Sequence, residues 1–153
     1  MKKQSHSFIV LMADDDEDDC LLVELAFKDM SNACDLRFVD DGRELLNYLY
    51  NRGDFSDPEE YPRPNLILLD LNMPRIDGRE ALTTIKSDPQ LLGIPILIFT
   101  TSRAAQDIEL AKQAGASSYL CKPEVLEDFT GMLSAFCTAI QHGPNIPFQV
   151  IGC

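Results

Sequence analysis

Carboxylate side chains follow two apolar runs of the sequence, at the point where each run ends. The run FIVLM is followed, after one alanine, by an acidic stretch that begins with Asp14 and Asp15, and the run LILL is followed directly by Asp70. Mg²⁺ prefers hard oxygen ligands and keeps several waters, which leaves room for a phosphorylated substrate. A carboxylate can itself act as a nucleophile and form an aspartyl phosphate. We therefore expect a metal at Asp14 and Asp15 and treat Asp70 as a candidate nucleophile.

Two further apolar runs are followed by side chains of types that can bind phosphoryl oxygens. The run ILIF is followed by Thr100, Thr101 and Ser102, and the run SYLC is followed by Lys122 and Pro123. Lys122 would be a fixed cation on the phosphoryl oxygens, and Thr100 a hydroxyl donor to the same group. Each is ordinary when taken alone, since a lysine is usually solvated and threonine often ends a strand. Four apolar runs are thus followed by groups suited to phosphoryl chemistry, and this coincidence favours one common site.

The remainder of the acidic run has a simpler interpretation. Carboxylates in the first turn of a helix satisfy free backbone N–H groups and face the positive end of the helix dipole. Asp16, Glu17, Asp18 and Asp19 are therefore interpreted as helix-capping residues.

Five short apolar runs, three of them continuously apolar, predict strands that are covered on both faces, as in a parallel sheet. They cover residues 8–12, 36–39, 66–69, 96–99 and 118–121. Segments with helical spacing lie between them, with an apolar stripe after the first run at Leu22, Leu25 and Ala26. The last helical stripe comprises Phe129, Met132, Leu133, Phe136, Cys137 and Ile140. This alternation predicts an α/β fold, in which ligands bind beyond the carboxyl ends of the strands.

Composition excludes several classes of protein. The 153 residues include 25 acidic and 13 basic ones, and the net charge of −12 disfavours binding to nucleic acid or to an anionic membrane. The apolar runs are far shorter than the roughly 20 residues that span a bilayer, and no signal-peptide pattern is present. The odd number of scattered cysteines is interpreted as reduced thiols in a cytoplasmic protein. They are Cys20, Cys34, Cys121, Cys137 and Cys153.

The motifs ADDDEDD, LILLDLNMPRIDG, ILIFTTS and GASSYLCKP resemble those of the receiver domain of two-component response regulators, in the family's order and spacing. The resemblance covers nearly the whole chain. It implies a doubly wound, flavodoxin-like parallel sheet of five strands in the order 2-1-3-4-5, with five helices. The segment before the third strand, together with IKSDPQLLGIPILIFTTS, further resembles single-domain regulators that are paired with cyanobacterial and bacterial phytochromes.

The resemblance implies roles for the acidic residues. Asp70 would be the phosphoacceptor, and Asp14 and Asp15 the acidic pair, with Asp15 the direct metal ligand. The implied cofactor is Mg²⁺, with Mn²⁺ as a substitute, and Asn72 would add its backbone carbonyl to the coordination shell.

Roles for the remaining motif residues follow from the same resemblance. Thr100 corresponds to the conformational-switch hydroxyl, Lys122 to the phosphate-binding lysine, and Tyr119 to the aromatic switch position. Pro123 corresponds to the proline whose preceding peptide bond is cis in the family. Ser102 and Asn72 occupy positions that modulate dephosphorylation. For Tyr119, a half-buried ring with its hydroxyl at the surface is the alternative to a switching role.

The domain organisation predicted from the sequence is a tail at residues 1–7, a receiver domain at 8–141 and a second tail at 142–153. The polar segment 52–65 contacts a partner or is a tolerated surface insertion. Only 12 residues follow Gln141, so the expected output is contact with a downstream protein target, not an attached DNA-binding domain. The apolar residues of the second tail would join a homodimer surface, or the tail is loose or packs back on the domain.

The sequence therefore predicts a phosphoacceptor in a phosphorelay that signals by protein contact. It would take its phosphoryl group from a sensor histidine kinase, phytochrome-like in type, or from a histidine phosphotransfer protein. The resemblance implies that kinase specificity lies near the first helix and the loop around Lys122 to Glu124. No enzymatic activity is expected beyond self-catalysed phosphoryl transfer and autodephosphorylation.

Three other interpretations compete with this one. A Mg²⁺-dependent phosphohydrolase also uses a strand-end aspartate, but it needs a second acid two residues on, where this chain has Asn72. An interaction module that has lost the chemistry is disfavoured by the complete set of functional residue types. A calcium loop fails because Asp19 replaces the turn glycine and Leu25 the final glutamate.

Overall fold

Strands and helices alternate along residues 8–29, 34–122, 126–143 and 146–153, the parts of the chain that the computed structural model describes. The strands in these ranges are β1 (Phe8–Ala13), β2 (Cys34–Val39), β3 (Leu66–Leu69), β4 (Ile96–Thr100), β5 (Ser118–Cys121) and β6 (Val150–Ile151). The helices are α1 (Glu17–Asp29), α2 (Gly42–Leu49), α3 (Gly78–Ser87), α4 (Ala105–Ala114) and α5 (Leu126–His142), with a 3₁₀ turn η1 (Gly53–Phe55).

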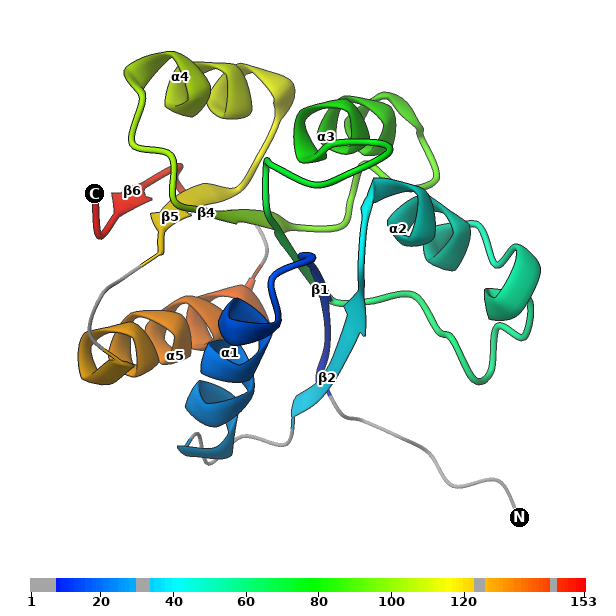
Figure 1. Ribbon diagram of the computed structural model, residues 1–153, viewed down its shortest axis with the longest axis horizontal. Helices are drawn as coiled ribbons and strands as arrows, with labels where there is room; N and C mark the ends of the chain where they lie inside the picture. Colours follow the sequence, from blue (N-terminus) through cyan, green and yellow to red (C-terminus); the bar gives the residue numbers. More distant parts are fainter. Residues whose placement is uncertain (1–7, 30–33, 123–125, 144–145) are drawn as a thin grey trace.

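The strands form one parallel sheet in the order β2-β1-β3-β4-β5-β6. Helices α1 and α5 lie on one face of the sheet, and α2, α3 and α4 cover the other (Figure 1). Every residue of β3, β4 and β5 is buried, as expected for strands that are covered on both faces. The predicted fold class and the order 2-1-3-4-5 are confirmed, and β6 extends the sheet beyond β5.

Each face of the sheet has its own hydrophobic core, because successive side chains of a strand point to opposite faces. Leu11 of β1 belongs to the cluster that includes residues of α2, α3 and α4, whereas Met12 belongs to the cluster that includes residues of α1 and α5. The predicted stripe of the last helix lies in this second cluster, with Phe129 and Leu133 fully buried. The core therefore fixes both helical layers against the strands whose ends carry the candidate site.

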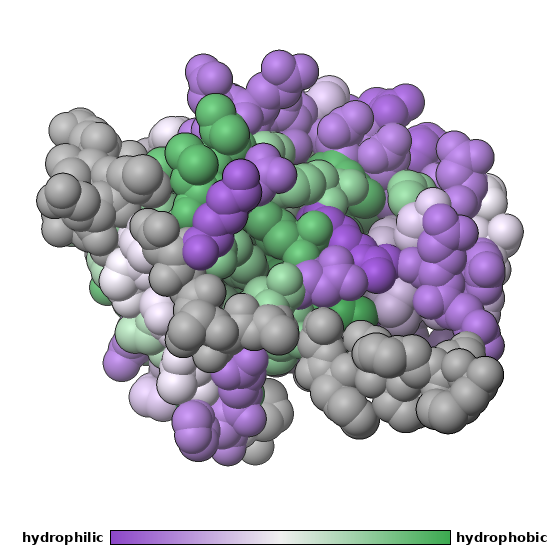
Figure 2. All heavy atoms as spheres, turned by 90° about the horizontal axis from the view of Figure 1, so that it is seen from below, coloured by the Kyte–Doolittle hydropathy of each residue, from purple (hydrophilic) through white to green (hydrophobic). Residues whose placement is uncertain are grey.

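The apolar stripe predicted for α1 is wrong at one position. Val23 and Ala26 are fully buried, but Leu25 is 40% exposed and Leu21 is 52% exposed. The helix turns its Val23–Ala26 side towards the sheet, so Leu25 falls outside the buried stripe. Figure 2, which views the molecule from the side of α1 and α5, shows hydrophobic surface among hydrophilic side chains on this face.

The C-terminal segment is packed on the domain, which was one of the alternatives left open by the sequence. β6 pairs in parallel with β5, with Tyr119 opposite Val150 and Leu120 opposite Ile151. The interpretation that all five cysteines are reduced thiols is contradicted, because Cys121 and Cys153 form a disulfide. They are 32 residues apart in sequence, and it is the pairing of β6 with β5 that brings them together.

The polar segment 52–65 is anchored by aromatic side chains. Phe55 and Tyr61 pack against the core next to Tyr48 of α2, and their ring centroids lie 5.1 Å apart in an edge-to-face arrangement. The segment is therefore a structured part of the domain surface, and its partner role stays a prediction. Among the helices that the structure describes, none combines the length and the hydropathy needed to cross a bilayer.

Candidate functional site

The register of the parallel strands places Asp14 and Asp70 next to one another at the carboxyl end of the sheet. β1 and β3 pair Ala13 with Leu69, so the next residue along each strand is an aspartate. The amide of Asp70 donates to the carbonyl of Ala13 at 3.1 Å, which continues the pairing one residue past β3. Both aspartates are buried. The two aspartates that follow apolar runs in the sequence therefore lie side by side at the same edge of the sheet.

Lys122 reaches this pair of carboxylates from the end of β5. Its amide donates to the carbonyl of Thr100 at 2.8 Å, which holds it against the end of β4. Its ammonium nitrogen lies 2.6 Å from Asp19 Oδ2, 2.8 Å from Asp14 Oδ2 and 3.2 Å from Asp70 Oδ2. Because the lysine side chain is only 6% exposed, water screens these interactions weakly. One ammonium group therefore faces three carboxylates.

The electrostatics of the cluster leave it with surplus negative charge. Burial raises the pKa of Asp14 to about 6, although the ammonium of Lys122 opposes this rise. Burial alone would lower the pKa of Lys122, but its contacts with Asp14 and Asp19 outweigh that effect and raise the pKa above its ordinary value. The lysine therefore keeps its charge at neutral pH, whereas Asp14 is only weakly stabilised as a carboxylate.

Three carboxylates are placed so that they could hold a metal ion. Asp14, Asp15 and Asp70 each offer one oxygen, and these oxygens lie within 4.8 Å of one another. Asp14 Oδ2 is buried and, among the described residues, no aligned hydrogen bond reaches it despite the nearby ammonium. Asp15 is exposed, which leaves one side of the cluster open to water. Surplus negative charge, hard oxygen donors and an open side suit a divalent cation that keeps part of its hydration shell.

The loop after β3 holds the Asp70 carboxylate and leaves no space for a larger residue at Gly78. Asp70 Oδ1 accepts from the amide of Asn72 at 3.2 Å, and the amide of Gly78 donates to the carbonyl of Leu71 at 2.9 Å. A Cβ atom at Gly78 would lie 2.0 Å from the carbonyl oxygen of Asp70. The first turn of α3 can approach the loop this closely only because residue 78 is glycine. Gly78 lies within the LILLDLNMPRIDG motif but was not predicted to be a site residue.

Thr100 and Tyr119 are both fully buried beside this edge. Thr100 is opposite Cys121 in the register of β4 and β5, and its Oγ1 accepts from the amide of Ser102 at 3.4 Å. The hydroxyl of Tyr119 donates to the carbonyl of Ser102 at 3.0 Å. The alternative of a half-buried Tyr119 with its hydroxyl at the surface is therefore contradicted. Both candidate switch side chains bond to the same residue.

A hydrogen-bond network that the sequence analysis missed joins the loops after β3 and β4 to α4. Ser102 Oγ donates to Asp107 Oδ2 at 2.6 Å, and Arg79 Nη2 lies 3.1 Å from both oxygens of Asp107. Arg79 Nη1 also donates to the carbonyl of Leu71 and the side-chain oxygen of Asn72, both at 3.4 Å. The hydrogen bond from Arg79, and after it that from Ser102, lowers the pKa of Asp107. Ser102 and Asn72 were predicted as site residues. Arg79 and Asp107 lie on helices α3 and α4, where no strand-end pattern marks them.

The capping interpretation holds for one end of the acidic run and fails at the other. Asp16 Oδ1 accepts from the amides of Asp18 and Asp19, as a cap of α1 does. Asp19 does not cap the helix, because its carboxylate turns to Lys122. A position in the first turn of α1 suits either role, so the sequence held no signal for the contact with Lys122. Pro123 and the bond before it lie outside the described residues.

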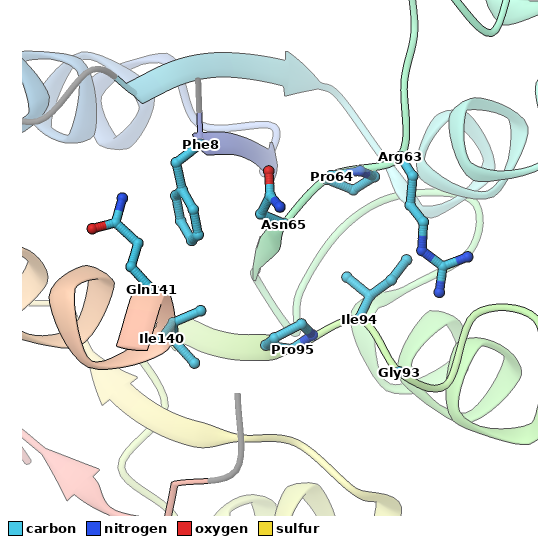
Figure 3. A pocket seen from close by; sticks show the side chains of 9 residues that line it. All are labelled: Phe8, Arg63, Pro64, Asn65, Gly93, Ile94, Pro95, Ile140 and Gln141. Carbon is cyan, nitrogen blue, oxygen red and sulfur yellow. The ribbon is translucent and has the colours of Figure 1, made fainter. Parts of the chain in front are cut away.

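A cavity of about 410 Å³ lies at the opposite end of the sheet (Figure 3). It is lined by residues from the start of β1, the segments before β3 and β4, and the end of α5, with Phe8, Asn65 and Ile140 among them. None of the residues that line it is a carboxylate. The cavity is therefore separate from the acidic site.

A parallel α/β sheet in this strand order, with an acidic pair, a third aspartate, a threonine and a lysine at one edge, defines the receiver class of α/β proteins. The model of the response regulator receiver domain matches residues 10–134. The chain belongs to this family.

Response regulators, one of them a cyanobacterial phytochrome response regulator, are among the most similar proteins. Response regulator Rcp1 from Synechocystis sp. is 36% identical over 125 residues, which cover 82% of this chain and 83% of Rcp1. The structure of the phosphorylated cyanobacterial phytochrome response regulator RcpA matches with a TM-score of 0.82 and 30% identity, covering 92% of this chain and 99% of RcpA. The Mn²⁺-bound form of Rcp1 matches with a TM-score of 0.78 and 33% identity, covering 91% and 98% of the two chains. The resemblance stated from the sequence motifs is thereby confirmed.

Proposed function

We propose that Asp70 accepts a phosphoryl group from a phosphohistidine of a sensor histidine kinase or histidine phosphotransfer protein, or from a small phosphate donor. The observation that carries this proposal is the position of its carboxylate. It lies at the sheet edge, 6% exposed, within 3.2 Å of the Lys122 ammonium and next to the acidic pair Asp14 and Asp15. Membership of the receiver family and similarity to phosphorylated RcpA support it.

The residues at this edge have complementary roles in the transfer. An oxygen of Asp70 attacks phosphorus, the bond from phosphorus to the donor nitrogen breaks, and the donor imidazole keeps the electron pair. Lys122 places a fixed positive charge beside the phosphoryl oxygens, and Thr100 offers them a hydroxyl donor. The amide of Asn72 holds Asp70 Oδ1, which orients the attacking carboxylate. Hydrolysis of the acyl phosphate, at a rate that Asn72 and Ser102 would modulate, returns the protein to its resting state.

Asp14, Asp15 and Asp70, with the backbone carbonyl of Asn72, would hold Mg²⁺, or Mn²⁺ in its place. When bound, the ion neutralises negative charge that would otherwise repel the incoming phosphoryl group. The three carboxylate oxygens within 4.8 Å of one another support this assignment, and the Mn²⁺-bound structure of Rcp1 agrees with it.

The partner that we propose is a phytochrome-like histidine kinase in the cytoplasm. The similarity to Rcp1 and to RcpA, a cyanobacterial phytochrome response regulator, supports this choice. It would dock beside α1, where Leu21 is exposed in a hollow that it shares with Asp14 and Asp15. Output would pass from the α4, β5 and α5 surface to a downstream protein, with a homodimer as one form of that contact. The net charge of −12 argues against nucleic acid and anionic membranes as partners.

The test is labelling with acetyl phosphate and Mg²⁺, followed by intact-mass analysis. One phosphoryl group that is stable in acid and lost in alkali is expected, and excess EDTA should prevent labelling. Asp70→Asn should abolish it, whereas Asp18→Asn, which removes an exposed charge from the same acidic run, should not. Equal labelling of Asp70→Asn and wild type would show that the assignment is wrong. Steady turnover of p-nitrophenyl phosphate would instead favour a phosphohydrolase.

A further inference from the structure

Residues 146–153, here named the C-terminal strap, cross the edge of the sheet beside β5 (Figure 1). Phe148 packs against the core on the α2–α4 side, and Ile146 and Ile151 pack against the core on the α1 and α5 side. The strap therefore covers the open edge of β5 and contacts both helical layers. It lies on the same surface from which the proposed output would pass.

Few non-covalent interactions hold the strap. The amide of Tyr119 donates to the carbonyl of Gln149 at 2.9 Å, and the amide of Gln149 donates to Ser118 Oγ at 3.2 Å. Arg103 Nη1 donates to the carbonyl of Gly152 at 3.0 Å. The strand itself has two residues, and Val150 is 46% exposed. None of residues 146–153 is fully buried, and such terminal segments open at low free-energy cost unless a further bond holds them.

The disulfide between Cys121 and Cys153 holds the C-terminal strap on β5 covalently. The two Cα atoms are 5.2 Å apart, within the range that a disulfide requires. Gly152 adopts a φ of +75°, which turns the chain so that its last residue faces the end of β5. Cys121 is fully buried, whereas Cys153 is exposed. A thiol in solution can therefore reach the bond through the sulfur of Cys153.

The other three cysteines are unpaired and do not compete for this bond. Burial raises the pKa of Cys20 to about 12 and that of Cys137 to about 12, and it also raises the pKa of Cys34. Thiolate is the reacting form in disulfide exchange, so a raised pKa lowers the reactivity of these groups near neutral pH. The fold thus presents one pair of sulfurs for reversible oxidation.

We propose that Cys121 and Cys153 are a redox-modification site that locks the C-terminal strap over β5 when oxidised and releases it when reduced. For oxidation, a low-molecular-weight disulfide receives two electrons, becomes two thiols, and leaves Cys121 joined to Cys153. For reduction, a dithiol thiolate attacks Cys153 Sγ, Cys121 leaves as the thiolate, and the second thiol of the reductant completes the exchange. In a reducing compartment such a bond is transient and senses the redox state.

The site is one residue from the phosphoryl-binding group of the proposed function. Cys121 precedes Lys122 and is opposite Thr100 in the β4–β5 register, and Lys122 donates its amide to the carbonyl of Thr100. An influence of the strap on phosphorylation or on output rests on the proposed function. The redox chemistry and the release of the strap do not.

The first experiment measures the disulfide in the full-length chain. The protein is equilibrated with graded ratios of oxidised to reduced glutathione, quenched in acid, denatured, alkylated with N-ethylmaleimide and mapped by peptide mass. A single reversible Cys121–Cys153 bond is expected, with the other three cysteines alkylated throughout. Five alkylated cysteines at every ratio, or a bond between another pair, would overturn the proposal.

The second experiment measures release of the strap by hydrogen exchange with mass spectrometry. Reduction by dithiothreitol should speed exchange in peptides covering residues 118–121 and 146–153 at least tenfold, with little change in the rest of the sheet. Cys153→Ser should exchange as the reduced protein does under all conditions, and Cys34→Ser should behave as wild type. Equal exchange in the oxidised and reduced forms would refute the locking role.

Asp70→Asn separates this inference from the proposed function. The variant should form the Cys121–Cys153 bond at the same glutathione ratio as wild type, because Asp70 does not contact either sulfur. In wild type, absence of phosphoryl labelling together with a normal Cys121–Cys153 bond would remove only the proposed function. Normal labelling of wild type without that bond would remove only the redox site.

Discussion

The pH dependence of stability should reveal the cost of burying Asp14. In the folded protein its pKa is raised from 3.8 to about 6, chiefly by burial, so the folded state binds a proton more tightly than the unfolded chain does. Such a group contributes stability that is fully present below about pH 4 and is lost as the pH rises through about 6. At about 1.4 kcal/mol for each tenfold change in proton affinity, the loss is about 3 kcal/mol.

Asp14→Asn replaces the carboxylate with a neutral side chain of the same shape. Without metal, the variant should match wild type near pH 4.5 to within about 1 kcal/mol and exceed its free energy of unfolding by up to about 3 kcal/mol at pH 7.5. Urea unfolding followed by circular dichroism, in EDTA and at a fixed redox state, measures this difference. The comparison between variant and wild type cancels the opposite acid dependence of Asp41 and Asp107, whose pKa values are lowered.

Asp15→Asn is the matched control, since Asp15 is the next residue and carries the same charge but is exposed. Without metal, its free energy of unfolding at pH 7.5 should differ little from that of wild type, because water and salt screen an exposed charge. With Mg²⁺ present, Asp15→Asn should have the larger effect of the two substitutions on metal binding, because it removes the proposed direct ligand. A metal-free Asp14→Asn variant that keeps the wild-type pH slope, or that is less stable at pH 7.5, would refute the reasoning from burial.

Three other substitutions test the surroundings of the site. Gly78→Ala should lower the free energy of unfolding by more than about 2 kcal/mol in urea unfolding, because its Cβ would lie 2.0 Å from the carbonyl oxygen of Asp70; an unchanged midpoint would contradict this close approach. Arg79→Met breaks a partly exposed ion pair with Asp107 and should lower the free energy of unfolding by no more than about 1 kcal/mol, and by less in high salt. A larger decrease would show that this ion pair is better shielded from water. Lys122→Met should abolish labelling by acetyl phosphate and, at pH 8 without metal, destabilise the fold by about 3–5 kcal/mol, with partial recovery at pH 5; full labelling would remove the lysine from the site.

The positions of the principal site residues could be predicted because the strand-end rule is local. Continuous apolar runs identify buried parallel strands, and their carboxyl ends meet at one edge whatever the details of packing. Asp14, Asp70, Thr100 and Lys122 follow this rule. Their roles in phosphoryl transfer come from the family resemblance and are tested only by the experiments above.

The features that the sequence did not predict depend on the direction of individual side chains or on distant packing. Asp19 could cap α1 or face the sheet, and only the position of Lys122 decides between them. The requirement for glycine at Gly78 arises because α3 approaches the Asp70 carbonyl, which is set by tertiary packing. The disulfide depends on a two-residue strand at the edge of the sheet, too short for periodicity to detect.

The bonds around Ser102 suggest how a change at Asp70 could reach the α4 surface. The amide of Ser102 donates to Thr100 Oγ1, its carbonyl accepts from Tyr119, and its hydroxyl donates to Asp107 of α4. A Thr100 hydroxyl that turns towards a phosphoryl oxygen gives up the first of these bonds. Ser102 is then free to shift unless the other two bonds hold it, and each of them leads to an element of the proposed output surface. A two-state switch therefore requires the Tyr119 and Asp107 contacts to change together with the Thr100 contact, because a buried polar group that loses one partner must gain another.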